Sequence, residues 1–129
     1  MSKSALTVKA FGIYLLVLGV SLTVHPNFLL SIFRIAQTTE VWIRVLGVVV
    51  FNIGIYYWYA AQCEAKAFFQ ATVYARTLVL VAFTIFAVLG LASPMLVLFG
   101  AVDFAGAVWT QVALKTEQRR SLPFIRSGA

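Results

Sequence analysis

The sequence predicts an all-helical membrane protein, an antiparallel bundle of four transmembrane helices with a short interfacial helix after the first span. Three observations indicate this fold. Of the 129 residues, 62% are hydrophobic and only 11% are charged, whereas a soluble domain is about half apolar and about a quarter charged. The apolar residues form four runs, and each run has about the 20 residues that a helix needs to cross a bilayer. Short polar or proline-containing segments separate the runs.

The first predicted span covers residues 5–24. It ends at His25 and Pro26, because proline biases the preceding residue away from helical geometry. Residues 28–37 are too few to cross a membrane, and their large apolar side chains fall on one side of a helix, away from Arg34. This pattern is typical of an interfacial helix that lies along the membrane surface.

The other three spans follow at short intervals. The second covers residues 41–61, and Glu40 adds an acidic group at its start, where the helix dipole favours one. The third covers residues 69–92. A Ser-Pro pair then turns the chain directly into the fourth span, residues 95–114. The third and fourth spans must therefore be antiparallel neighbours.

Residues 115–129 form a basic tail that we expect to be loosely ordered. Four spans, in residues 1–114, put both termini on one side of the membrane. Most Lys and Arg residues flank that side, so the positive-inside rule predicts that both termini are cytoplasmic. The formal charge of +6 then reflects membrane topology and not nucleic-acid binding. We expect the tail to dock on anionic lipids.

Glycines recur two helical turns apart in the first two spans. Gly12 and Gly19 share one helix face, as do Gly47 and Gly54. Small residues let membrane helices approach closely. We interpret these faces as helix-packing surfaces, and a substrate groove is the alternative.

Asp103 is a carboxylate in the middle of the fourth span, within "FGAVDFAGAVWT". Helical spacing puts it on a small, polar face with Gly106 and Thr110. A charge exposed at the bilayer centre costs about 2.5 to 3.5 kcal/mol on insertion scales, so this carboxylate needs a partner or a proton. We predict a buried ion pair with Arg76 of the adjacent third span, or else with Arg44.

Two further residues extend this candidate site. Glu40 lies four residues before Arg44, the favourable orientation for a helical ion pair. Asn52 lies on a polar helix face and can join Thr72 in a hydrogen-bonded network. The candidate ligand or ion-pair cluster comprises Asp103, Arg76, Arg44, Glu40 and Asn52. It either locks the register of the bundle or binds a ligand, an ion or a proton.

Familiar catalytic motifs are missing from the chain, which has no GxSxG, HExxH, phosphate loop, GxGxxG or CxxC. The single cysteine, Cys63, cannot form an internal disulfide, and His25 stands beside a proline without another metal-ligating residue near it. We therefore predict no catalytic residue, no metal and no cofactor. The leading hypothesis is a small non-enzymatic membrane protein that binds or conducts a small or amphipathic molecule through its polar cluster.

Two alternatives stay open. One is a structural accessory subunit of a larger membrane complex. The other is an intramembrane enzyme that acts on a lipid-like or quinone-like substrate, for which the polar cluster would have to be reached through a cavity. Because small-residue faces promote association of membrane helices, we also expect a homo-oligomer or a subunit of a membrane complex.

Several motifs carry a resemblance to known proteins. They are "WIRVLG", "FFQATVYAR" and "FGAVDFAGAVWTQVAL", together with the pair Gly12 and Gly19 and the apolar segment after Pro26. This pattern resembles small uncharacterised bacterial four-span proteins and is similar to the DoxX-like group. The resemblance would cover nearly the whole chain. It implies a four-helix bundle in a bacterial inner membrane and carries over no catalytic residue.

Overall fold

A computed structural model describes residues 1–127, and it confirms the all-helical fold. Five helices follow one another along the chain: α1 (Lys3–Val24), α2 (Pro26–Ile32), α3 (Trp42–Gln62), α4 (Lys66–Val88) and α5 (Leu96–Ser127). Helices α1, α3 and α4 and the Leu96–Arg120 part of α5 are long and apolar enough to cross a membrane. The chain is therefore a multi-pass membrane protein.

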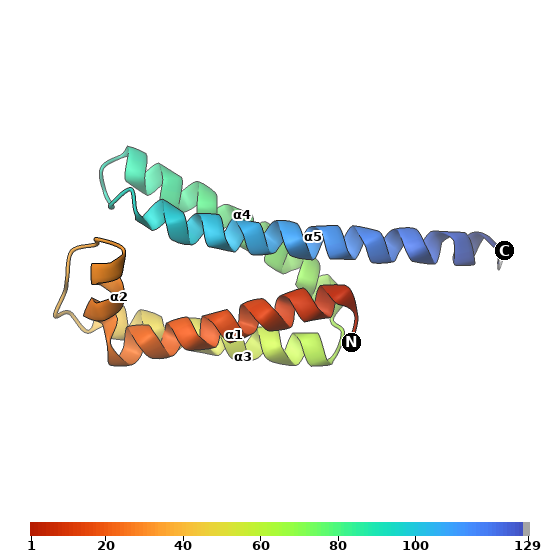
Figure 1. Ribbon diagram of the computed structural model, residues 1–129, viewed down its shortest axis with the longest axis horizontal. Helices are drawn as coiled ribbons and strands as arrows, with labels where there is room; N and C mark the ends of the chain where they lie inside the picture. Colours follow the sequence, from red (N-terminus) through yellow and green to blue (C-terminus); the bar gives the residue numbers. More distant parts are fainter. Residues whose placement is uncertain (128–129) are drawn as a thin grey trace.

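The four long helices form two antiparallel pairs (Figure 1). Helix α1 packs along α3, and α4 packs along α5. The pairs meet where α1 contacts α4 and α5, near the N terminus, and they diverge toward the opposite end, where α2 lies (Figure 1). The N terminus and the C-terminal part of α5 point to the same end of the molecule, as four spans require (Figure 1).

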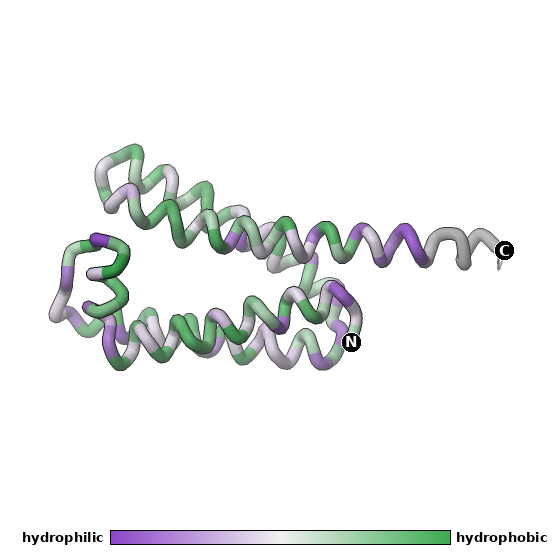
Figure 2. The backbone as a smooth tube through the Cα atoms, in the orientation of Figure 1, coloured by the Kyte–Doolittle hydropathy of each residue, from purple (hydrophilic) through white to green (hydrophobic). Residues whose placement is uncertain are grey.

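Hydropathy follows this arrangement. Figure 2 shows long helices that are mainly hydrophobic, with hydrophilic residues gathered near the N terminus and in the C-terminal part of α5. Because lipid supplies no water to satisfy backbone groups, such apolar helices are stable as membrane spans. The hydrophilic end is suited to the membrane surface.

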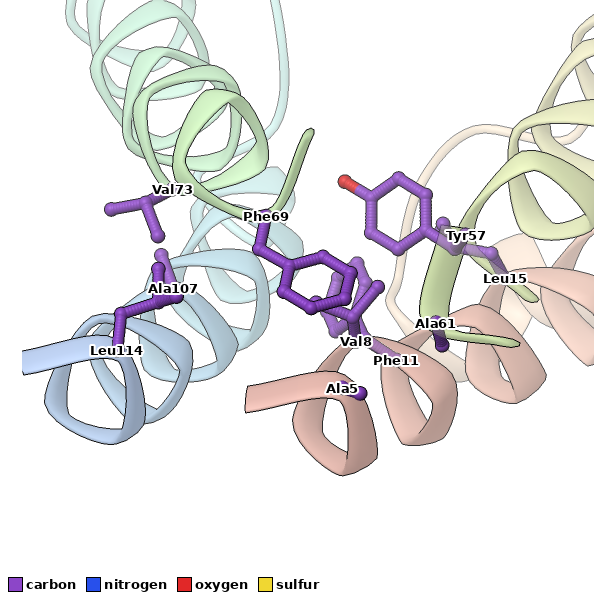
Figure 3. Packing of buried hydrophobic residues seen from close by; sticks show 10 residues of the cluster. All are labelled: Ala5, Val8, Phe11, Leu15, Tyr57, Ala61, Phe69, Val73, Ala107 and Leu114. Atoms are coloured by element: carbon purple, nitrogen blue, oxygen red, sulfur yellow. The ribbon is translucent and has the colours of Figure 1, made fainter. Parts of the chain in front are cut away.

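The buried hydrophobic core lies at the end where the two pairs meet. Its side chains come from all four long helices (Figure 3), and Val8 of α1 and Phe69 of α4 are completely buried. All buried residues of α4 lie between Phe69 and Arg76. Beyond Arg76 the α4/α5 pair separates from the α1/α3 pair, so the core does not extend to the opposite end.

Helices α1 and α3 approach most closely at glycines. A Cβ at Gly19 would lie 2.6 Å from the backbone nitrogen of Phe51, and a Cβ at Gly54 would lie 3.0 Å from the backbone oxygen of Gly12. A Cβ at Gly47 would lie 2.9 Å from the backbone oxygen of Gly19. The interpretation of these glycines as helix-packing surfaces is confirmed.

The short helix differs in its bounds from the predicted residues 28–37. It begins earlier, at Pro26, because proline has no N–H to lose in the first turn of a helix. It ends at Ile32, and Arg34 then takes a positive φ of 54°. Residues 35–40 have no regular secondary structure.

The helix that contains the predicted fourth span does not end at residue 114. Helix α5 continues through Ser127, so the tail that we expected to be loosely ordered is helical as far as the structure describes it. Lys, Glu, Gln and Arg follow the last apolar turn, and all four are good helix formers. Residues 128–129 of the predicted tail lie outside the described residues.

Candidate functional site

A cavity of about 380 Å³ lies between the two helix pairs. Its wall is formed mostly by leucine, isoleucine, valine and phenylalanine side chains from all five helices. Four polar residues also line it: Tyr14, Tyr57, Arg76 and Asp103. Its volume falls within the range of about 300 to 1,000 Å³ that is common for small-molecule sites.

Helix α2 covers the end of the cavity where the pairs diverge. Leu29 and Leu30 of α2 line the cavity. Phe33, which follows α2, packs on Phe99 of α5, with 4.1 Å between the ring centroids. Since α2 follows directly on α1, this aromatic contact joins the two helix pairs at their open end.

Arg76 lies at the inner end of the cavity and is only 2% exposed. Its Nη2 donates to the hydroxyls of Thr72 and Thr110, each at 2.9 Å, and its Nε donates to the backbone oxygen of Thr72 at 3.2 Å. The guanidinium also lies over the ring of Phe11, 4.7 Å from the centroid. The ring of Tyr57 lies 5.8 Å away, so two neighbouring threonines and two rings hold this buried cation.

The network continues from Thr110 to helix α1. The hydroxyls of Thr110 and Thr7 are 2.8 Å apart, and Thr7 donates to the backbone oxygen of Ser4 at 2.7 Å. Each hydroxyl carries one proton, so Thr110 must donate to Thr7 while it accepts from Arg76. This directed chain of hydrogen bonds joins α4, α5 and α1 at a fixed register.

One donor of Arg76 is left over. Its Nη1 is buried and finds no acceptor among the described residues. This atom lies beside Gly106, where a Cβ would be only 3.0 Å away. A buried N–H without an acceptor is rare and costs about 1 to 3 kcal/mol. Arg76, whose side chain lines the inner end of the cavity, thus retains an unused hydrogen-bond donor.

Asp103 is half-buried and lines the same cavity. Within the described part of the chain, no salt bridge joins it to Arg76 or to Arg44, so the predicted ion pair is wrong as a direct contact. The reason is that the guanidinium of Arg76 turns to Thr110, which lies two helical turns from Asp103 on the same face of α5. Arg76 and Asp103 share a cavity and interact electrostatically, but no salt bridge joins them.

The other three predicted site residues lie on exposed surfaces. Arg44 donates from Nη1 to the backbone oxygens of Thr23 and Val24, at 2.5 and 3.5 Å. It thereby satisfies carbonyls at the end of α1 that lack helical partners. Glu40 does not pair with Arg44 among the described contacts, and Asn52 does not reach the threonine network. The cavity wall, as described, includes none of the three.

A polar cluster that the sequence patterns did not predict lies at the end of the molecule that carries both termini. Lys66 donates to the hydroxyls of Ser2 and Ser4 at 2.7 and 2.8 Å, and it pairs with Glu117 at 2.7 Å. Glu64 accepts from the backbone N–H of Ser2 at 2.7 Å, and Glu117 accepts from that of Ser4 at 2.9 Å. The two carboxylates therefore cap the positive end of the α1 dipole.

One signal for this cluster was present in the sequence. Two serines precede the first apolar run, as is typical of a helix N-terminus. Their acidic partners are 62 and 113 residues away along the chain. Spacing alone cannot pair groups that far apart, so the cluster required the helix arrangement.

We expect this cluster to make stability depend on pH. Hydrogen bonds from Ser2 hold the pKa of the Glu64 carboxyl below its usual value. The folded chain then takes up this proton less readily than the unfolded chain. The stabilisation is present above the ordinary glutamate pKa of about 4.3, and it is lost as pH falls through the lower folded-state pKa.

Thermal unfolding in detergent micelles tests this pH dependence. The acid-induced loss of stability should be smaller in Glu64→Gln than in the unsubstituted protein, by about 1 kcal/mol or less, because the carboxyl faces solvent. Glu40→Gln is the matched control, since Glu40 is an exposed glutamate outside the cluster, and it should keep the full acid loss. An acid loss of the same size in Glu64→Gln would contradict the assignment.

Together these features define a class: a multi-pass helical membrane protein with an apolar intramembrane cavity that ends in an arginine and an aspartate. No family model, no curated protein and no solved structure matches this chain. The resemblance to the DoxX-like group therefore stays a prediction from the quoted motifs.

Proposed function

We propose that this protein binds a small amphipathic molecule within the membrane, without catalysing a reaction. The apolar part of the ligand would lie along the cavity, and its polar part would lie beside Arg76 and Asp103. The observation that carries the proposal is the composition of the cavity wall, which is almost wholly apolar around these two charged side chains. Apolar lining with a few convergent polar groups is typical of small-molecule sites.

The cavity favours a ligand over a purely structural role for the charged residues. Polar groups that only fix helix register are best packed tightly with every hydrogen bond made. Here Arg76 keeps an unpaired N–H, and Asp103 faces cavity space. An enzyme acting on a lipid-like or quinone-like substrate would use the same cavity and stays the alternative.

We also propose an orientation. Lys66 and the exposed basic residues Lys115, Arg119 and Arg120 gather toward the end that carries both termini. The positive-inside rule supports a cytoplasmic location for this end in a bacterial inner membrane. There the C-terminal part of α5 would contact anionic lipids, at about 1 kcal/mol for each basic residue near the surface.

A substitution that fills the cavity tests the binding proposal. Ala75 and Ala71 lie one turn apart on α4 and are both exposed, but of the two only Ala75 lines the described cavity wall. Ala75→Phe should lower ligand occupancy about tenfold or more, since 1.4 kcal/mol of lost binding energy is a factor of ten. Ala71→Phe adds the same bulk elsewhere and should leave occupancy unchanged.

Native mass spectrometry of protein released from lipid particles gives the measurement, because it reports bound small molecules and subunit number together. The unsubstituted protein and Ala71→Phe should each retain a small molecule. Retention of the same molecule by Ala75→Phe at the same level would refute binding in this cavity. The subunit number from the same spectra tests the expected self-association or partner assembly.

A further inference from the structure

We infer that the polar head of the ligand is uncharged and carries both a hydrogen-bond donor and an acceptor, as an alcohol or a primary amide does. This inference rests on the proposed function, since it concerns the same cavity. It adds the chemical class of the head group, which follows from the charge and the unused hydrogen-bonding capacity at the inner end.

The charges at the inner end disfavour a head with a single charge. Arg76 stays protonated in proteins, and the carboxylate of Asp103 balances it. The other described residues of the cavity wall are uncharged side chains. A cationic head would be attracted by Asp103 but repelled by Arg76, and an anionic head the reverse, so either gains little Coulomb energy to offset its loss of hydration. A neutral head avoids that cost.

The unused hydrogen-bonding groups require a head that both accepts and donates. Nη1 of Arg76 is a buried donor with no acceptor in the part of the chain that the structure describes. A carboxylate such as Asp103 can only accept. A hydroxyl or an amide can accept from Nη1 and donate to Asp103 at once. An ether or ester would satisfy the arginine but leave the carboxylate without a donor.

The two groups lie along one face of α5. Nη1 lies beside Gly106, where a Cβ would be 3.0 Å from it and 2.9 Å from the ring of Phe11. Asp103 lies three residues earlier on the same helix face, a rise of about 4.5 Å along α5. Glycine at 106 leaves the guanidinium next to the helix backbone. We expect one hydroxyl or amide group, placed between these two positions, to meet both side chains.

The rest of the cavity suits a hydrocarbon tail. From Phe11 and Tyr57 at the inner end, the wall continues along Leu18 and Leu22 of α1 toward Leu30 of α2. All of these side chains offer apolar surface, and burial of apolar ligand surface stabilises the complex. A medium-chain alcohol therefore represents the expected ligand class.

Three probes with the same chain and different heads test the inference: decanol, decanoate and decylammonium. Each is titrated into the protein in lipid particles, with empty particles as the reference for partition into lipid, and bound probe is counted by native mass spectrometry. Binding within the cavity is the part that Ala75→Phe removes and Ala71→Phe retains. Decanol should bind in the cavity about tenfold more tightly than either ion, or better, which corresponds to about 1.4 kcal/mol.

Charge-changing variants of the site sharpen the test. Asp103→Asn keeps a hydrogen-bonding side chain and removes the negative charge. The affinity for decanoate should therefore rise about tenfold relative to the affinity for decanol. Arg76→Gln keeps a donor and removes the positive charge, so the affinity for decylammonium should rise relative to the affinity for decanol. An unchanged order of the three probes in both variants would show that these side chains do not contact the head.

The outcomes separate the two proposals. If decanoate or decylammonium binds in the cavity more tightly than decanol, the cavity binds ligands but the head-group inference is wrong. If no probe shows binding that Ala75→Phe removes, the proposed function fails and the inference fails with it.

Discussion

Replacing Gly19 with alanine is expected to force α1 away from α3 and to destabilise the whole bundle. A Cβ at this position would lie 2.6 Å from the backbone nitrogen of Phe51 and 2.8 Å from the backbone oxygen of Gly47. Both are backbone atoms, so no side-chain rotation relieves the clash. Overpacking of this kind costs about 1 to 3 kcal/mol. Helix propensity predicts the opposite sign, because alanine is favoured over glycine by about 1 kcal/mol.

The measurement is the free energy of unfolding in mixed micelles. Gly47→Ala should show the same loss, since its Cβ would lie 2.9 Å from the backbone oxygen of Gly19. Ala105→Val is the control, because Ala105 is exposed on α5 and has room for a larger side chain. If Gly19→Ala proved as stable as the unsubstituted protein, the close approach of α1 and α3 at this point would be wrong.

Replacing Arg76 with methionine is expected to weaken both the fold and ligand binding. Methionine keeps an unbranched side chain that can fill the same space. The hydroxyls of Thr72 and Thr110 lose the donor that now lies 2.9 Å from each. Hydrogen bonds to a charged group contribute about 1.5 to 3 kcal/mol each. Removal of a buried charge offsets part of that loss, so we expect a net destabilisation of about 1 to 3 kcal/mol.

Binding of decanol in the cavity should fall about tenfold or more in Arg76→Met, because the donor for the ligand head is lost. Arg44→Met is the matched control: Arg44 is exposed and bonds to the end of α1, so its loss should leave decanol binding unchanged. Arg76→Leu, which also lacks a donor, keeps the experiment informative if Arg76→Met does not fold. Equal decanol binding by folded Arg76 variants and the unsubstituted protein would contradict the site.

Much of the fold follows from local properties of the chain. The predicted first span, residues 5–24, corresponds to α1 (Lys3–Val24), and the second, residues 41–61, corresponds to α3 (Trp42–Gln62). Both depend on apolar runs that are long enough to cross a membrane and that are terminated by polar residues or by a proline. The predicted third span, residues 69–92, extends beyond the end of α4 at Val88. Residues 89–92 are mostly apolar, but they form a turn in which Gly90 has a φ of 75°. Hydropathy does not detect a backbone turn of that kind.

The candidate site was predicted only in part. Asp103 and Arg76 were found because a charged residue within an apolar span is conspicuous, and both line the cavity. Arg44, Glu40 and Asn52 were grouped with them by depth and helix face alone. Their exposure shows that those two criteria do not determine which neighbour a face meets, since rotation of each helix about its axis also decides it.

The amino-acid sequence was sufficient for the number of spans, their antiparallel order, the glycine faces and the presence of two charged groups within the membrane, because each depends on residues close together in the chain. Arg76 bonds to Thr110 and not to Asp103 because of how far α4 is shifted along α5. The packing around Phe69 and Ala107 sets this shift. The cavity exists because the two helix pairs diverge beyond Arg76. That divergence is a matter of crossing angles between distant segments, and no local pattern of residues encodes it.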